Sequence, residues 1–182
     1  MNISNIAAEY RIACDTPSDI QEHIPTLYSL ARECNHIVEG GVRYVVSSWA
    51  FIYGCACRGG TVDSYCWNRL PEIERAIDIC QKADVRWGYY DGDWLKREIP
   101  ENDLLFIDTN HTYAQLKEEL LRHGSKATRY IVLHDTVTFG TRGEDNKEPG
   151  LWRAVEELVA EGSWAIKEHF TNNNGLTVLE KV

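Results

Sequence analysis

Two acidic residues of this chain follow apolar runs, at positions typical of catalytic or metal-binding side chains. Asp108 follows an apolar run at residues 102–107, and His134 and Asp135 follow a second apolar run at residues 130–133. Carboxylates beside an imidazole can bind a divalent cation, and the histidine can instead act as a general base, because its ordinary pKa lies near neutrality. The pattern predicts one catalytic or metal-binding centre made of these three side chains, with both roles open.

The elements that carry these side chains are predicted by the two apolar runs. Short continuous apolar runs are typical of strands buried on both faces of a parallel sheet. In such sheets the ligand crevice lies beyond the carboxyl ends of the strands, and neighbouring strands are only about 4.8 Å apart. We therefore expect Asp108, His134 and Asp135 to converge. His111 is interpreted as a structural residue near the start of a helix that begins at Thr112.

The rest of the chain alternates between strand and helix patterns. The Asn174-Gly175 pair is a strong signal for a hairpin between the last two strands. This order predicts an α/β fold with a doubly wound, mostly parallel seven-stranded sheet and a C-terminal antiparallel hairpin. We expect one domain over residues 1–182, with a loose arm or short helix at residues 1–17. The other expected strands are residues 36–39, 61–65, 85–90, 164–170 and 176–179.

Composition narrows the classes of partner. The 182 residues are 43% hydrophobic and 26% charged, with a net charge of −9, which argues against binding to a nucleic-acid backbone. We expect no membrane span and no signal peptide, and hence a cytoplasmic protein that acts on a small molecule. The six cysteines contain no C-x-x-C spacing, so reduced thiols are expected. The oligomeric state is left open.

Several stretches resemble motifs of the class I S-adenosylmethionine-dependent methyltransferases, and more narrowly of their small O-methyltransferase branch. The resemblance runs from about Ser18 to the C-terminus. It implies a Rossmann-like methyltransferase fold, S-adenosylmethionine as cofactor, and methyl transfer to an oxygen of a small hydroxylated acceptor such as a sugar. The stretches are residues 38–50, 92–93, 106–113 and 131–136.

The resemblance also assigns roles to individual residues. Glu39 is expected to anchor the amino-acid end of the cofactor, Asp93 to contact the adenine side, and Asp108 to lie beside the cofactor. In relatives that use a metal, acidic residues at the ends of these two strands bind a divalent ion such as Mg²⁺, here Asp108, His134 and Asp135. The full set implied for the cofactor is Glu39, Gly40, Gly41, Ser47, Cys66, Asp93 and Asp108.

Two residues depart from the family pattern. Relatives usually carry glycine where this chain has Val45, so positive φ there would strain the backbone by roughly 1–3 kcal/mol, and the side chain is expected to crowd the cofactor. Relatives usually carry an acid for the ribose where this chain has Cys66, and a thiol lacks the paired acceptors of a carboxylate. The alternatives are a protein of this fold that does not bind the cofactor and, third, a metal-assisted hydrolase.

Overall fold

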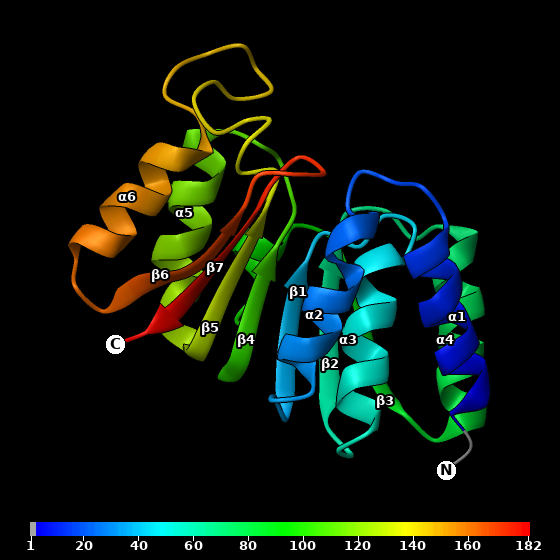
Figure 1. Ribbon diagram of the computed structural model, residues 1–182. Coiled ribbons are helices and arrows are strands. Elements are labelled where there is room, and N and C mark those ends of the chain that lie inside the picture. The colour runs from blue at the N-terminus through cyan, green and yellow to red at the C-terminus, as the bar shows by residue number, and fades with distance from the viewer. Residues whose placement is uncertain (1–2) are drawn as a thin grey trace.

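The computed structural model describes residues 3–182, and all of its strands join one seven-stranded sheet in the order β3-β2-β1-β4-β5-β7-β6 (Figure 1). The first five strands in the chain run parallel, and β7 is antiparallel to both β5 and β6. The strands are β1 (His36–Gly40), β2 (Thr61–Cys66), β3 (Arg86–Asp91), β4 (Asn102–Ile107), β5 (Ala127–His134), β6 (Trp164–Phe170) and β7 (Leu176–Lys181).

Helices cover both faces of the sheet, because successive residues of a buried strand point to opposite sides. Leu104 and Phe106 pack in the core under the first four α-helices, whereas Leu105 and Ile107 pack in the core under the last two. The helices are α1 (Ser4–Asp15), α2 (Ile24–Ala31), α3 (Val46–Ala56), α4 (Pro71–Ala83), α5 (Tyr113–His123) and α6 (Leu151–Ala160), with short turns η1 (Gln21–His23), η2 (Trp94–Lys96) and η3 (Gly124–Lys126).

The predicted fold class is confirmed, and the closing hairpin shows why. Asn174 and Gly175 have φ values of 70° and 95°, the left-handed backbone that this dipeptide tolerates best. The turn sends β7 back between β5 and β6, where Val132 pairs with Val178. The apolar runs at residues 102–107 and 130–133 lie in β4 and β5.

The start of the chain differs from a loose arm. Residues 4–15 form α1, and Ile6 is fully buried in the core that α1 shares with α3 and α4. Before β1 the chain forms η1 and then α2. No helix within residues 3–182 has the length and apolar character needed to cross a membrane.

The loop between β1 and α3 is strained, as predicted for Val45. Val45 has φ of 66° and Arg43 has φ of 49°, so two non-glycine residues of one short loop are left-handed. The Val45 side chain is 1% exposed and faces a small cavity beside Ile12 of α1 and Trp49 of α3. Val45 does not line either of the two cavities that reach Asp108, which speaks against the expected crowding of the cofactor.

Candidate active site

The ends of β4 and β5 bring the predicted carboxylates together. Asp108 and Asp135 each follow the last residue of their strand. The Asp108 amide donates to the carbonyl oxygen of Gly40 at 2.9 Å, so the end of β4 is fixed against the end of β1. Asp135 has φ of 60°, an uncommon conformation that aspartate tolerates better than most residues.

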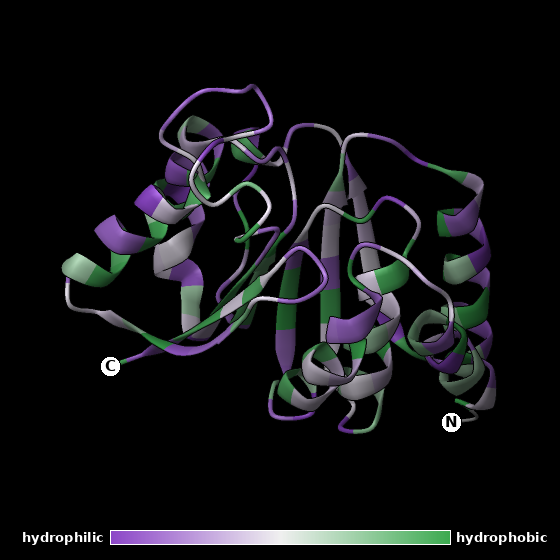
Figure 2. Ribbon diagram, turned by 45° about the horizontal axis from the view of Figure 1, so that its top comes forward, coloured by the Kyte–Doolittle hydropathy of each residue, from purple (hydrophilic) through white to green (hydrophobic). Residues whose placement is uncertain are grey.

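His111 lies between these two carboxylates. Its Nε2 is 3.2 Å from Asp108 Oδ1 and 2.9 Å from Asp135 Oδ2, while its Nδ1 is 3.1 Å from Glu144 Oε2. The ring stacks on Phe139 with centroids 4.8 Å apart. Both Phe139 and Glu144 belong to the loop after β5, which is hydrophilic over most of its length (Figure 2). This loop is therefore attached to the site through His111.

His134 contacts the same two carboxylates from the buried side. Its Nδ1 is 3.4 Å from Asp108 Oδ1 and 3.3 Å from Asp135 Oδ2. Its Nε2 donates to the carbonyl oxygens of Asp19 and Asn173, at 3.1 and 3.3 Å. Both ring nitrogens lie near oxygen atoms, an arrangement that favours the protonated ring, and the His134 side chain is only 2% exposed. The side chain braces three segments of the chain and is poorly suited to accept a further proton.

The four side chains form one coupled charge cluster. Burial alone would lower the pKa of either histidine, but the hydrogen bonds to Asp108 and Asp135 outweigh it and raise the pKa of His111 and of His134 to about 10. Burial alone would raise the pKa of Asp135, but its bonds to His111 and His134 hold that pKa well below the usual range. These opposite pKa shifts favour protonated histidines beside ionised carboxylates, so their charges balance within the cluster.

Two adjoining cavities meet at Asp108. The first, of about 280 Å³, has aromatic and small side chains on one side and reaches His111 and Asp135 on the other. The second, of about 320 Å³, mixes apolar side chains with charged and hydroxyl groups, among them Ser47. The two share Asp19, Val42, Arg43 and Asp108. A ligand that bridges both cavities would pass directly over Asp108.

Comparisons with known proteins rest on structure alone. No family model matches the chain, and no curated protein sequence matches it. Solved structures do match. The O-methyltransferase TomG from Streptomyces achromogenes, in complex with SAM, superposes with a TM-score of 0.72 at 17% identity, covering 100% of this chain and 91% of its own.

The O-methyltransferase from Bacillus cereus, in complex with SAH, gives 0.71 at 14% identity, covering 100% and 92% of the two chains. SAH-bound PaMTH1 from Podospora anserina gives 0.70 at 14% identity, covering 98% and 88%. The chain has the class I O-methyltransferase fold.

Within this methyltransferase fold, Glu39 is sealed off from both cavities. It is fully buried, and its carboxylate accepts hydrogen bonds from Ser47 at 2.6 Å, Ser48 at 2.7 Å and Ser64 at 2.6 Å. Burial raises the pKa of Glu39 to about 7, although the serine hydroxyls oppose the rise. The only one of these groups that lines a cavity is Ser47, so Glu39 can act on a ligand only through Ser47.

The glycines of the first loop have separate tasks. A side chain at Gly41, where φ is 93°, would lie 1.8 Å from the carbonyl oxygen of Asp108, so only glycine lets the loop lie against the end of β4. A side chain at Gly40 would meet the ring of Trp94 at 2.6 Å. Gly41 therefore lines the first cavity, while Gly40 makes room for the aromatic floor beneath it.

The nucleoside side of the predicted cofactor site is only partly as expected. Cys66 lines the first cavity together with Trp67, which is 64% exposed, and Asn68. Asp93 instead caps η2, where it accepts from the amide of Leu95 at 3.1 Å, and the residues on either side of it line the cavity. Position 66 thus brings a thiol to this cavity, and Asp93 is not among the residues that line it.

A buried carboxylate holds the wall behind the site. Glu119 of α5 is fully buried, and its Oε1 accepts from Thr109 at 2.6 Å, Gln115 at 2.7 Å and the indole of Trp94 at 3.0 Å. Those three donors line the first cavity. Trp94 is thus a packing residue fixed from behind, with its ring under Gly40.

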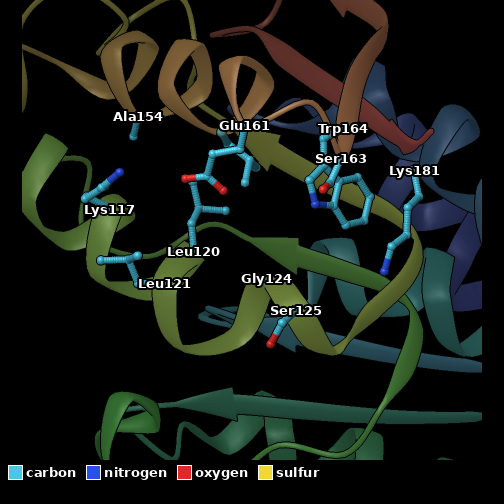
Figure 3. A pocket seen from close by; sticks show the side chains of 11 residues that line it. Lys117, Leu120, Leu121, Gly124, Ser125, Ala154, Glu161, Ser163, Trp164 and Lys181 are labelled. Atoms are coloured by element: carbon cyan, nitrogen blue, oxygen red, sulfur yellow. The ribbon is translucent and has the colours of Figure 1, made fainter.

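A separate cavity of about 290 Å³ lies toward the opposite end of the sheet, between α5, α6 and the start of β6 (Figure 3). Its lysines are already engaged: Lys117 pairs with Glu157 at 2.9 Å, and Lys181 donates to the carbonyl of Ala127 at 3.1 Å. The predicted site residues do not reach this cavity.

Sequence reasoning undervalued three residues. His111 is bound to both carboxylates, and its spacing of three residues from Asp108 was the available signal. Glu144 sits in a polar loop that gives no hint of contact with His111. Arg43 pairs with Asp19 at 3.2 Å across the cavity boundary, a contact between distant parts of the chain that no local pattern predicts.

Proposed function

We propose that this protein transfers a methyl group from S-adenosylmethionine to a hydroxyl oxygen of a small acceptor. The observation that carries the proposal is the pair of adjoining cavities that meet at Asp108, in a fold shared with SAM-bound and SAH-bound methyltransferases. Small-molecule sites span about 300–1,000 Å³, a range that the joined cavities reach. A sugar remains one candidate acceptor.

The residues present suit the cofactor. Trp67, which is 64% exposed, supplies flat apolar surface for a nucleoside, and Gly92, with φ of 104°, leaves the rim open. When bound, S-adenosylmethionine supplies an electrophilic methyl group on a positively charged sulfur. The carboxylate of Asp108, which faces both cavities, lies where it can stabilise that charge.

We also propose that Asp108, His111 and Asp135 bind a divalent cation. Asp108 Oδ1, His111 Nε2 and Asp135 Oδ2 lie within 4.8 Å of one another, and Asp135 Oδ1 is buried without a hydrogen-bond partner among the described residues. Glu144 at Nδ1 would hold His111 in the tautomer that leaves Nε2 free to bind. One nitrogen among oxygen ligands favours Mn²⁺ over Mg²⁺.

His111 replaces His134 in this proposed metal set. His134 has its Nε2 engaged with two carbonyl groups and its Nδ1 turned to two carboxylates, so it stays protonated and positions them. The His111 Nε2 proton lies between the same carboxylates on the cavity side. Any cation or acceptor hydroxyl that enters there must displace that proton. The cation, when bound, would acidify the acceptor hydroxyl.

The test begins with calorimetry of S-adenosylmethionine and S-adenosylhomocysteine on the wild-type protein. Binding should be detected, and ligand at 100 times its dissociation constant should stabilise the fold by about 2.7 kcal/mol. No heat and no stabilisation at millimolar ligand would refute the proposed cofactor. A screen of hydroxylated acceptors should then yield methylated product that is lost with a chelator and restored by Mn²⁺. If the chelator does not reduce product formation, the proposed cation is refuted.

A further inference from the structure

Arg43 places a positive charge at the boundary between the two cavities. It lies in the strained loop after β1, with φ of 49°, and its side chain lines both cavities. Its Nη1 is 3.2 Å from Asp19 Oδ2, so the ion pair lies on the boundary that the cavities share. Among the described residues that line the 320 Å³ cavity, Arg43 is the one Lys or Arg, facing the carboxylates of Asp19 and Asp108.

We propose that Arg43 recognises the carboxylate at the amino-acid end of the cofactor, and that the Arg43–Asp19 ion pair opens to admit it. This inference rests on the proposed function, because it concerns the same ligand. It assigns a residue that neither the motif resemblance nor the charge cluster around His111 identifies.

The character of the cavity walls decides which end of the ligand lies where. The 280 Å³ cavity has Tyr65, Trp67 and Trp94 around it, which suits the flat nucleoside. The 320 Å³ cavity mixes apolar side chains with the charged side chains of Asp19, Arg43 and Asp108, which can pair with the zwitterionic end of the ligand. The ligand carboxylate therefore enters a space where Asp19 and Asp108 repel it and Arg43 attracts it.

Ser47 cannot take over this task. It lines the same cavity, but its single hydroxyl proton is donated to Glu39 at 2.6 Å. Its oxygen can therefore accept a hydrogen bond from the ligand ammonium but has no proton left for the carboxylate. A guanidinium offers five N–H donors in a planar fork that matches a carboxylate.

Breaking the Arg43–Asp19 ion pair to bind the ligand carboxylate costs little free energy. The side chains of Arg43 and Asp19 are 71% and 48% exposed, and exposed ion pairs contribute only about 0–1 kcal/mol. Asp19 is held in place through its own backbone, whose carbonyl oxygen accepts from His134 Nε2 at 3.1 Å. Arg43 can thus turn from one carboxylate to another while Asp19 stays and becomes free to accept from the ligand ammonium.

The test compares two ligands on matched variants by calorimetry. S-adenosylhomocysteine carries the amino-acid end, whereas 5′-methylthioadenosine has the same nucleoside and thioether without it. Arg43→Ala should weaken binding of S-adenosylhomocysteine about 10–100-fold, the range for hydrogen bonds to charged groups. Binding of 5′-methylthioadenosine to the same variant should stay within about twofold, which also shows that the variant is folded.

Arg43→Lys keeps the charge but loses the fork, so an intermediate loss is expected. Arg153→Ala is the control, because Arg153 forms an exposed ion pair with Glu157 on α6, and neither residue lines these two cavities. Equal changes for both ligands, or no change for either, would overturn the role of Arg43. If the wild-type protein binds neither ligand, the proposed function fails, and this inference fails with it.

Discussion

Glu39 and Asp135 are carboxylates at the same edge of the sheet, yet their surroundings are opposite in kind. Glu39 lies inside β1, where three neutral serine hydroxyls enclose it and burial raises its pKa to about 7. Asp135 lies one residue beyond β5, where two histidine cations face it and lower its pKa. Asp135 lines a cavity and Glu39 does not.

The difference shows that a carboxylate within a strand and one just beyond a strand end meet different surroundings. A side chain within a strand points into a helix-covered face, and α3 supplies Ser47 and Ser48 to Glu39. A side chain just past the strand projects over the open edge. Neutral donors enclose Glu39, whereas Asp135 faces charged partners at a cavity, as the proposed cation site requires.

The largest effect is expected from removing the buried cation of the cluster. His134→Asn should lower the free energy of unfolding by about 3–5 kcal/mol, because the buried Asp135 and the partly exposed Asp108 lose a charged partner. The raised pKa of His134 means that this stabilisation is present below pH 6.5 and is lost as pH rises through about 10. Chemical denaturation at several pH values measures both.

The control for His134 is a histidine–aspartate pair outside the cluster. His36 Nε2 lies 2.8 Å from Asp63 Oδ2, but the His36 side chain is 26% exposed. His36→Asn should therefore cost about 1 kcal/mol or less. Losses of similar size in the two variants would contradict the view that the cluster depends on a buried charge.

The next largest effect is expected on cation binding by Asp108, His111 and Asp135. Asp135→Asn should weaken Mn²⁺ binding by more than about 100-fold, and Glu144→Gln, which acts through His111, by about 10–100-fold. Electron paramagnetic resonance of Mn²⁺ measures both without an acceptor. Glu148→Gln is the matched control, because Glu148 lies in the same loop but pairs with Arg142 at 2.7 Å. A similar Mn²⁺ affinity in the wild type and all three variants would refute the proposed cation site.

A smaller effect is expected on how the free energy of unfolding depends on pH, with opposite signs for Glu39 and Asp135. The raised pKa of Glu39 stabilises the fold below about pH 4.5, and this advantage over Glu39→Gln is lost as pH rises to about 7. The lowered pKa of Asp135 stabilises the fold above about pH 3.8, and this advantage over Asp135→Asn is lost as pH falls. Each difference should be about 1–3 kcal/mol in denaturant titrations. If the stability difference from wild type changed with pH in the same direction for both variants, the two acids would not have opposite surroundings.

The smallest effect concerns the strained loop. Val45→Gly should leave the affinity for S-adenosylhomocysteine within about twofold, because the Val45 side chain faces α1 rather than the cavities. Relief of backbone strain and loss of buried side-chain contacts oppose each other, so the free energy of unfolding should change by less than about 2 kcal/mol. Tighter binding, measured by calorimetry, would mean that the valine does reach the ligand.

The sheet was predictable because its signals are local. Apolar runs such as residues 102–107 end at a polar residue, and the Asn174-Gly175 pair requires a tight turn. The meeting of Asp108 with Asp135 follows from the parallel pairing of β4 with β5. These are consequences of period and chain direction, which a sequence displays directly.

The detailed site was less predictable because side-chain direction depends on tertiary contacts. His134 and Asp135 are adjacent in sequence, but His134 turns inward to the carbonyls of Asp19 and Asn173, while Asp135 lines the cavity. His111 reaches both carboxylates only because the turn after β4 folds back. Similarly, Asp93 has the expected place along the chain, yet its carboxylate caps a short helix.

The position of β7 gives the site a late step in its assembly. The carbonyls of Asn172 and Asn173, in the turn before β7, bind the buried rings of His23 and His134. During synthesis, every other element of the sheet leaves the ribosome before β7 does. Until β7 arrives, β5 has an unpaired edge, and His134 lacks one of its two carbonyl partners. His134 therefore gains its second carbonyl partner only when the turn before β7 is in place.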